Sequence, residues 1–257
     1  MKVMFDSNVW RKIAIPEDNT DDPQYAALCA IHDAIVDGRI EAYISENIFT
    51  LENIPRKDRK SKVGSMKAKT TITEKTSGAK TDINIVVGPN PKDAVTLDDH
   101  EFLRKPIEAA LAIGFRIVRL PRIGGLTNTD IEEKRYKVPD FEAYYNKATE
   151  VAMKIEANGA GFSQLEELVK LNPGNSITEK INNAPECDKK KIAAAIAEAV
   201  DGDAVATSIG LGCDFFCTRD EAKGAGNKSV LSAVNISWLH ADYGFEVKKP
   251  EEVAVLL

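Results

Sequence analysis

Carboxylates adjoin two apolar segments that lie near opposite ends of this chain of 257 residues. Near the start, Val3-Met4-Phe5 leads directly into Asp6; far downstream, Asp203 precedes and Asp220 follows the apolar segment Phe215-Phe216-Cys217. In a parallel α/β sheet, ligands and chemistry collect outside the carboxyl ends of the strands. Several acids at that edge repel one another unless a cation lies among them. The pattern therefore predicts a divalent-metal site.

Longer motifs surround these acids, and they are FDSNVW at 5–10, SENIFTLE at 45–52, DAVATSIGLGCDFFCTRD at 203–220 and the tail YGFEVKKPEEVAVLL at 243–257. Together they resemble a PIN domain, the metal-dependent nuclease fold found in toxin nucleases of toxin–antitoxin pairs and in RNA-processing enzymes. The resemblance covers residues 1–56 and 190–257, with weaker support over 98–120.

The resemblance implies a site that hydrolyses phosphodiester bonds with Mg²⁺ or Mn²⁺. The implied catalytic residues and metal ligands are Asp6, Glu52, Asp203 and Asp220. Two divalent ions about 3.5–4 Å apart can activate water and neutralise the phosphate, and such hard cations prefer oxygen ligands. The implied activity is that of an endoribonuclease with RNA as its partner, although the residues leave RNA and DNA both open.

Two positions in this acid set have alternatives. Glu52 follows Thr50-Leu51, as the family pattern requires, but Glu46 lies nearer the N-terminus of the same helix, which is predicted over 46–54. Asp203 is expected to begin a helix over 204–211. Asp201 then either adds an acid to the metal site or caps that helix, a common position for aspartate.

Polar neighbours of the acids are expected to support them. Asn8 is predicted to hold the loop that presents Asp6, and Thr218 to hydrogen-bond a carboxylate or a bound water. Arg219 is a candidate contact for a phosphate, and Ser45 is expected to cap a helix.

Basic residues are concentrated between positions 56 and 80. This segment holds nine Lys or Arg residues against Asp58 and Glu74, a net charge of +7 in a chain whose net charge is −6. Lys and Arg gain affinity for nucleic acid by neutralising phosphates and releasing counterions. The expected nucleic-acid-binding residues are Arg56, Lys57, Arg59 and Lys60.

The elements that must position these residues alternate along the chain. Apolar periodicity predicts helices over 20–38, 98–114 and about 229–242, with strands over 40–44, 115–120 and 245–247. This order predicts an α/β fold, a PIN-like doubly wound parallel sheet flanked by helices. We expect a single domain over 1–257 that carries a basic β-hairpin insertion at 56–97 and a helical insertion at 121–190.

Composition favours a soluble cytoplasmic protein. Hydrophobic residues make up 43% and charged residues 29% of the chain, without an apolar run long enough to span a membrane. The four cysteines lack a CxxC spacing and are expected to be reduced. By resemblance, partners include an antitoxin or a second copy. A catalytically silent PIN-like module that binds RNA or protein is the alternative function, whereas a haloacid-dehalogenase-type phosphatase would need an acid where Asn8 stands.

Overall fold

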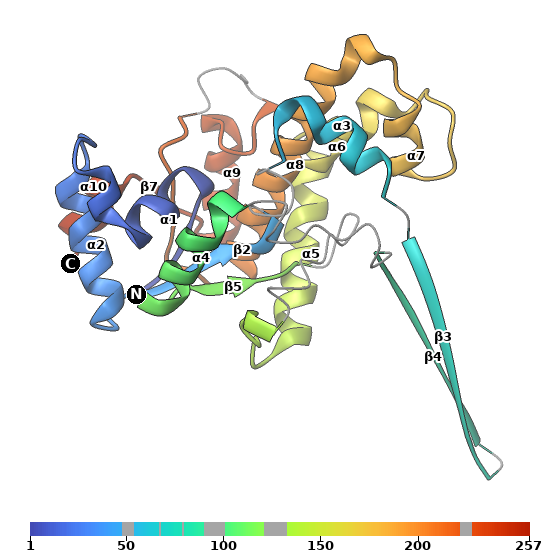
Figure 1. The fold of residues 1–257 in the computed structure, drawn as a ribbon, viewed down its shortest axis with the longest axis horizontal. Coiled ribbons are helices and arrows are strands. Elements are labelled where there is room, and N and C mark those ends of the chain that lie inside the picture. Colours follow the sequence, from blue (N-terminus) through green and yellow to red (C-terminus); the bar gives the residue numbers. More distant parts are fainter. Residues whose placement is uncertain (48–53, 67, 79, 90–100, 121–132, 222–227) are drawn as a thin grey trace.

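Five parallel strands form the central sheet of the computed structural model, which describes residues 1–257 except 48–53, 67, 79, 90–100, 121–132 and 222–227 (Figure 1). The strands are β1 (Lys2–Phe5), β2 (Glu41–Ser45), β5 (Arg116–Val118), β6 (Phe215–Cys217) and β7 (Val247–Lys248). Their order is β5-β2-β1-β6-β7, and every neighbouring pair is parallel. The predicted α/β class and parallel sheet are confirmed.

The chain reverses its direction across the sheet at β1. It runs outward from β1 to β2 and β5, then returns to place β6 on the other side of β1. Met4 pairs with Tyr43 on one side and with Phe216 on the other. Ligands of open α/β sheets bind at such a switch point, beyond the carboxyl ends of the strands. The end of β1 is therefore the place to look for a site.

Helices cover both sides of this sheet. One group consists of α1 (Ser7–Ala14), α2 (Tyr25–Val36), α4 (Glu101–Ile113) and α10 (Pro250–Val255), which contact one another. Helix α8 (Lys189–Gly210) contacts β1, β2 and β6 and lies on the other side, as Figure 1 shows. Val3, Met4 and Phe5 are fully buried because both faces of β1 are covered. Three further elements are η1 (Pro16–Asn19), η7 (Glu186–Asp188) and α9 (Ala233–Tyr243).

Most predicted elements are present with shifted ends, but α8 differs from its prediction. A helix was expected to begin after Asp203, whereas α8 begins at Lys189 and runs for 22 residues. Ile192, Ile196 and Val200 recur every four residues and are buried, so the apolar stripe carries the helix onward. Asp201 and Asp203 therefore lie within the helix, and the expectation that Asp201 caps it is wrong.

The basic segment divides into a helix and a hairpin. The hairpin that the sequence predicts is present as β3 (Ala68–Ser77) and β4 (Lys80–Pro89), two antiparallel strands of ten residues each. The residues before it do not belong to it, because 56–64 form helix α3 (Arg56–Gly64). Arg59 and Val63, four residues apart, are the buried face of α3, which packs on α7 (Ile177–Asn182) and α8.

The segment predicted to be a helical insertion is mostly helical in its described part. Helices α5 (Phe141–Ala157) and α6 (Phe162–Val169) pack along α8. Buried residues of α5 belong to the same hydrophobic cluster as β1. Among the described residues, no helix is both long and apolar enough to cross a membrane. All four cysteines are free thiols.

Candidate active site at the switch point

Asp6 occupies the switch point between β1 and β6. Its backbone N–H donates to the carbonyl of Cys217 at 3.0 Å, which joins the ends of the two strands. Its own backbone is extended, and its side chain caps the N-terminus of α1. Only 5% of the residue is exposed. The turn from strand to helix thus holds a carboxylate at the buried edge of the sheet, as the first motif predicts.

Three neutral donors surround the Asp6 carboxylate. Oδ1 accepts a hydrogen bond from the backbone N–H of Ser7 at 2.6 Å. Oδ2 accepts from the hydroxyl of Thr218 at 2.6 Å and from Nδ2 of Asn8 at 2.8 Å. Asn8 and Thr218 therefore make the supporting contacts that the sequence predicts for them.

The orientation of these two donors is determined by further bonds. Oδ1 of Asn8 accepts from the backbone N–H of Arg219 at 3.0 Å, so its amide nitrogen must face Asp6. The hydroxyl oxygen of Thr218 accepts from the backbone N–H of Asp220 at 2.9 Å and from Asn8 at 3.2 Å. Because both of its lone pairs are occupied, the Thr218 hydroxyl proton points to Asp6. The network holds Asp6 as an acceptor.

Burial works against the ionised form of this acceptor. Desolvation raises the pKa of Asp6 above its ordinary value, and the negative charge of Asp220 raises it further, while the bonds from Thr218 and Ser7 lower it. Among the described residues, no lysine or arginine forms an ion pair with Asp6. The site therefore holds a buried acid whose described hydrogen-bond donors are all neutral.

Asp203 reaches the same end of the sheet from α8. It is 2% exposed, and its Oδ2 accepts from Nδ2 of Asn47 at 2.9 Å. Asn47 lies two residues beyond the end of β2, so this bond connects α8 to the carboxyl end of a second strand. Asn47 was not among the predicted site residues, although its position just after a strand was a usable signal.

Glu46 is engaged by an arginine. Its side chain is buried, and its two carboxylate oxygens accept from Nε and a terminal nitrogen of Arg135 at 2.5 and 2.7 Å. Such bidentate geometry neutralises the acid. Glu46 is thus held in an ion pair, and Glu52, the favoured glutamate, lies outside the described residues.

Asp220 lies at the surface, whereas the neighbouring Arg219 is paired with another acid. Asp220 is exposed. The guanidinium of Arg219 donates to both oxygens of Asp22 at 2.8 and 2.9 Å, and this bonding holds the pKa of Asp22 far below its ordinary value. The expected contact of Arg219 with a phosphate does not fit this geometry, because Asp22 already occupies its terminal nitrogens. Asp22 itself gave no signal in the sequence beyond its charge.

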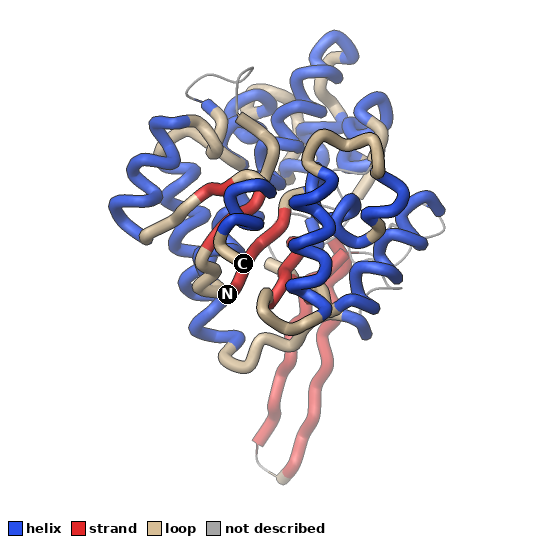
Figure 2. Tube along the Cα trace, turned by 90° about the vertical axis from the view of Figure 1, so that its left-hand side faces the viewer, coloured by secondary structure: helices blue, strands red, loops and turns tan. Residues whose placement is uncertain are grey.

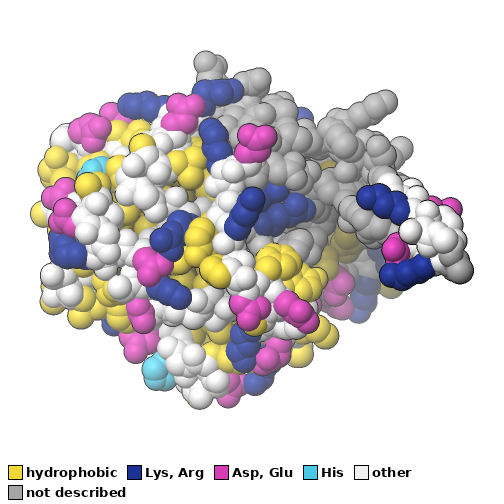
Figure 3. All heavy atoms as spheres, turned by 90° about the horizontal axis from the view of Figure 1, so that it is seen from below, with side chains coloured by type: hydrophobic (Ala, Val, Ile, Leu, Met, Phe, Trp, Pro, Cys, Tyr) yellow, Lys and Arg dark blue, Asp and Glu magenta, His cyan; other side chains and the backbone are white. Residues whose placement is uncertain are grey.

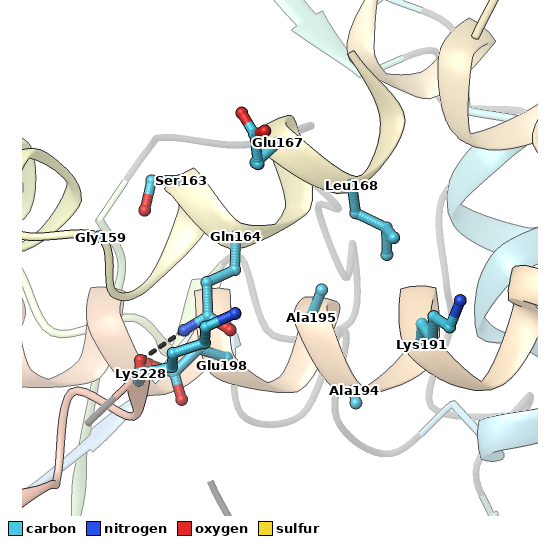
Figure 4. A pocket seen from close by; sticks show the side chains of 10 residues that line it. All are labelled: Gly159, Ser163, Gln164, Glu167, Leu168, Lys191, Ala194, Ala195, Glu198 and Lys228. Carbon is cyan, nitrogen blue, oxygen red and sulfur yellow. Dashed lines mark hydrogen bonds between the residues drawn. The ribbon is translucent and has the colours of Figure 1, made fainter. Parts of the chain in front are cut away.

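Glu198 on α8 is a second acid that the sequence analysis missed. Its Oε1 accepts from the backbone N–H groups of Gly161 and Val230 at 3.1 and 2.7 Å. Burial raises its pKa, and the negative charge of Asp220 raises it further by a smaller amount. Glu198 lines an open cavity of about 740 Å³ between α6 and α8, with Gln164 and Lys228 nearby (Figure 4). Only its setting in the alanine-rich stripe of α8 distinguished it in the sequence.

Two of the four residues expected to bind nucleic acid have structural roles. Arg59 is 5% exposed and donates to the carbonyls of Ile54 and Ala193 at 2.9 and 3.2 Å. It joins α3 to α8, so the prediction that it contacts a phosphate is corrected. Lys60 is largely covered and forms an ion pair with Glu186 at 3.3 Å. Arg56 and Lys57 are exposed.

The structure brings part of the predicted acid set together. The Asp6 carboxylate and the backbone N–H of Asp220 both hydrogen-bond the Thr218 hydroxyl, and the Asp203 carboxylate is linked to the neighbouring strand end through Asn47. Within the described parts of the chain, no group of three or more His, Cys, Asp or Glu residues could hold a metal ion. Comparison of the chain with protein-family models, curated proteins and solved structures finds no match in any of the three.

Proposed function

We propose that this chain is a PIN-like, divalent-metal-dependent nuclease that hydrolyses phosphodiester bonds, in the first instance an endoribonuclease. The observation that carries the proposal is the buried carboxylate of Asp6 at the switch point of the sheet, whose described donors are all neutral. A buried charge is costly unless it is paired or coordinates a metal. A cation beside Asp6 would remove that cost.

The donor chemistry at this edge suits Mg²⁺ or Mn²⁺, because both prefer carboxylate oxygens. The residues that would hold the ion are Asp6, Asp203 and Asp220, together with Glu52. When bound, such an ion supplies an activated water and neutralises phosphate charge. The chain itself contributes orientation, since Asn8 and Thr218 hold Asp6 as an acceptor rather than a donor.

The Asp6→Asn variant tests this proposal beside Asp37→Asn, which removes the same charge from a side chain that is 61% exposed. Labelled RNA and DNA, each as a single strand and as a duplex, are incubated with each protein and Mn²⁺, Mg²⁺ or EDTA. We expect metal-dependent cutting by the wild type and by Asp37→Asn, and none by Asp6→Asn. Cutting that survives in Asp6→Asn would exclude this site.

Metal binding has a readout that is independent of cleavage. A ligand at one hundred times its Kd stabilises a folded protein by about 2.7 kcal/mol, which for a chain of this size raises Tm by about 5–10 °C. We expect Mn²⁺ to raise the Tm of the wild type and of Asp37→Asn but not that of Asp6→Asn. An equal rise in all three proteins would place the metal elsewhere.

A catalytically silent module that binds RNA or protein is the second candidate. The observation in its favour is that Asp6 already accepts three hydrogen bonds and caps α1, which is a complete structural role. This candidate predicts nucleic-acid binding without turnover and without a rise in Tm on addition of Mn²⁺. Cleavage that depends on Asp6 would remove it.

A further inference from the structure

The β3–β4 ribbon (Ala68–Ser77 with Lys80–Pro89) projects from the body as an isolated arm (Figures 1 and 2). With ten residues in each strand, it is about 30 Å long. It leaves the molecule at the end toward which the arrows of β2 and β5 point in Figure 1. The arm therefore starts on the side of the sheet where Asp6 and Asp220 lie.

The pairing register separates two chemical faces on this ribbon. Lys75 pairs with Asp82 and Ser77 with Lys80, so these positions share one face, as does position 69. Lys75 and Lys80 thus fall on the same face of the ribbon. Lys80 is 80% exposed and pairs with Asp82, itself 67% exposed, at 3.1 Å. Basic and acidic side chains at the tip are visible at the right edge of Figure 3.

The opposite face is mainly apolar, although it also carries Glu74, which pairs with Ile83. Ile72 and Ile83 are 59% and 60% exposed, and the register places positions 85 and 87 on the same side. The ribbon is therefore amphipathic, and the two faces offer matched sites for substitution within a single element.

Net positive charge is concentrated in the arm and its base. Segment 56–80 carries +7, so the rest of the chain carries −13. On α3, at the base of the arm, Arg56, Lys57 and Lys62 are exposed. A polyanion is repelled by the body and attracted to the arm, because clustered charge of one sign creates a local potential even when the net charge opposes it.

The shape of the arm favours a duplex over a single strand. A two-stranded β-ribbon fits the major groove of B-form DNA, which is about 12 Å wide. Proteins that bind single strands stack the bases on aromatic side chains. Residues 68–89 include no Phe, Tyr or Trp. The ribbon can therefore contact a phosphate backbone through its lysines, while stacking on its own aromatic side chains is excluded.

We propose that the β3–β4 ribbon is a substrate-holding arm that lays its lysine-bearing face along the phosphate backbone of a nucleic-acid duplex. The arm's role in holding a substrate rests on the proposed nuclease function, but its binding of a duplex does not. The two are separable because binding is measured in EDTA, where cleavage cannot occur.

The test compares three double variants of the full chain. Lys75→Ser with Lys80→Ser removes charge from the polar face of the arm. Ile72→Thr with Ile83→Thr changes the apolar face of the same arm while keeping β-branched side chains. In the third variant, Lys147→Ser and Lys170→Ser remove the same charge from helices of the body.

Affinity for labelled DNA duplex, RNA duplex and the corresponding single strands is measured between 0.05 and 0.3 M salt. Each phosphate contact contributes about 0.9 to the salt slope, or about 5-fold in affinity at 0.15 M salt. We expect the arm-lysine variant to bind duplex about 30-fold more weakly, with a slope lower by about 2. The other two variants should bind as the wild type does. Comparing the affinities for DNA duplex and RNA duplex identifies which duplex is held.

Three results would refute the proposal that the arm binds a duplex: an unchanged salt slope in the arm-lysine variant, single strands bound as tightly as duplex, or an equal loss of duplex affinity in the body-lysine variant. A loss confined to the apolar-face variant, with a dimer by light scattering that this variant abolishes, would assign the arm to a second copy instead. Duplex binding through the arm without cleavage by the wild type would support the proposed role of the arm and contradict the proposed nuclease function. Cleavage with an unchanged KM in the arm-lysine variant would support the nuclease function and contradict the role of the arm in holding substrate.

Discussion

Replacing Thr218 by valine removes the hydroxyl that connects Asp6, Asn8 and Asp220 while keeping the volume of the side chain. Thr218 is 1% exposed, so water does not readily replace the lost donor. A hydrogen bond to a charged group contributes about 1.5–3 kcal/mol, whereas a neutral one contributes about 1 kcal/mol. We therefore expect Thr218→Val to lower the free energy of unfolding by about 2–3 kcal/mol at pH 8.

The effect should depend on pH in a definite direction. The folded-state pKa of Asp6 is raised, so its stabilising effect is complete below the unfolded pKa and is lost as pH rises through the folded pKa. The Thr218 bond is the strongest influence that lowers this pKa, and its removal raises it further. Stability of the variant should fall more steeply with pH than that of the wild type, and the difference should shrink to about 1 kcal/mol at about pH 3.5, below the ordinary pKa of aspartate.

Urea denaturation in EDTA at about pH 3.5 and at pH 8 measures both quantities. Thr218→Ser is the control, because it keeps the hydroxyl and loses one methyl group, at a cost of about 1 kcal/mol that does not change with pH. If the serine variant lost as much stability as the valine variant at pH 8, or the valine variant lost the same amount at both pH values, the hydrogen-bonded role of Thr218 would be refuted.

Three further substitutions probe the surroundings of the site. Arg59→Ala should lower the free energy of unfolding by about 2–4 kcal/mol and leave duplex affinity unchanged. Arg56→Ala should leave the free energy of unfolding unchanged and weaken duplex binding. Urea denaturation curves and binding titrations distinguish the two variants. Because the pKa of Glu198 is raised, stability is lost as pH rises through that pKa. Glu198→Gln should therefore flatten the fall in the free energy of unfolding, measured with urea, above about pH 4.5. An unchanged dependence on pH in this variant would contradict the prediction. Gly210→Ala brings a methyl group within 2.7 Å of Cβ of Ala148, so it should lower Tm despite a better helix propensity; a higher Tm would show that α5 yields.

The sequence alone determined the features that depend on neighbouring residues. Three consecutive apolar residues followed by Asp6 predict a buried strand that ends in an acid, and the structure has it. The hairpin follows from two β-branched segments around a glycine, and the parallel sheet follows from the alternation of strands and helices. Even the bonds from Asn8 and Thr218 to Asp6 were predictable, since Asn8 lies in the first turn of the helix after β1 and Thr218 follows β6, and a parallel sheet brings both strand ends to one edge.

Only the tertiary structure decided which charged side chains are free to act. Arg219 pairs with Asp22 across 197 positions of sequence, and Arg59 donates to Ala193 across 134. A long side chain on a helix or at a strand end can reach solvent or a neighbouring element, and local sequence does not distinguish the two outcomes. Glu198 shows the same dependence, because its partners come from two loops that only the packing of α6 and α8 brings to it. Charge is a property of the residue, whereas its availability is a property of the fold.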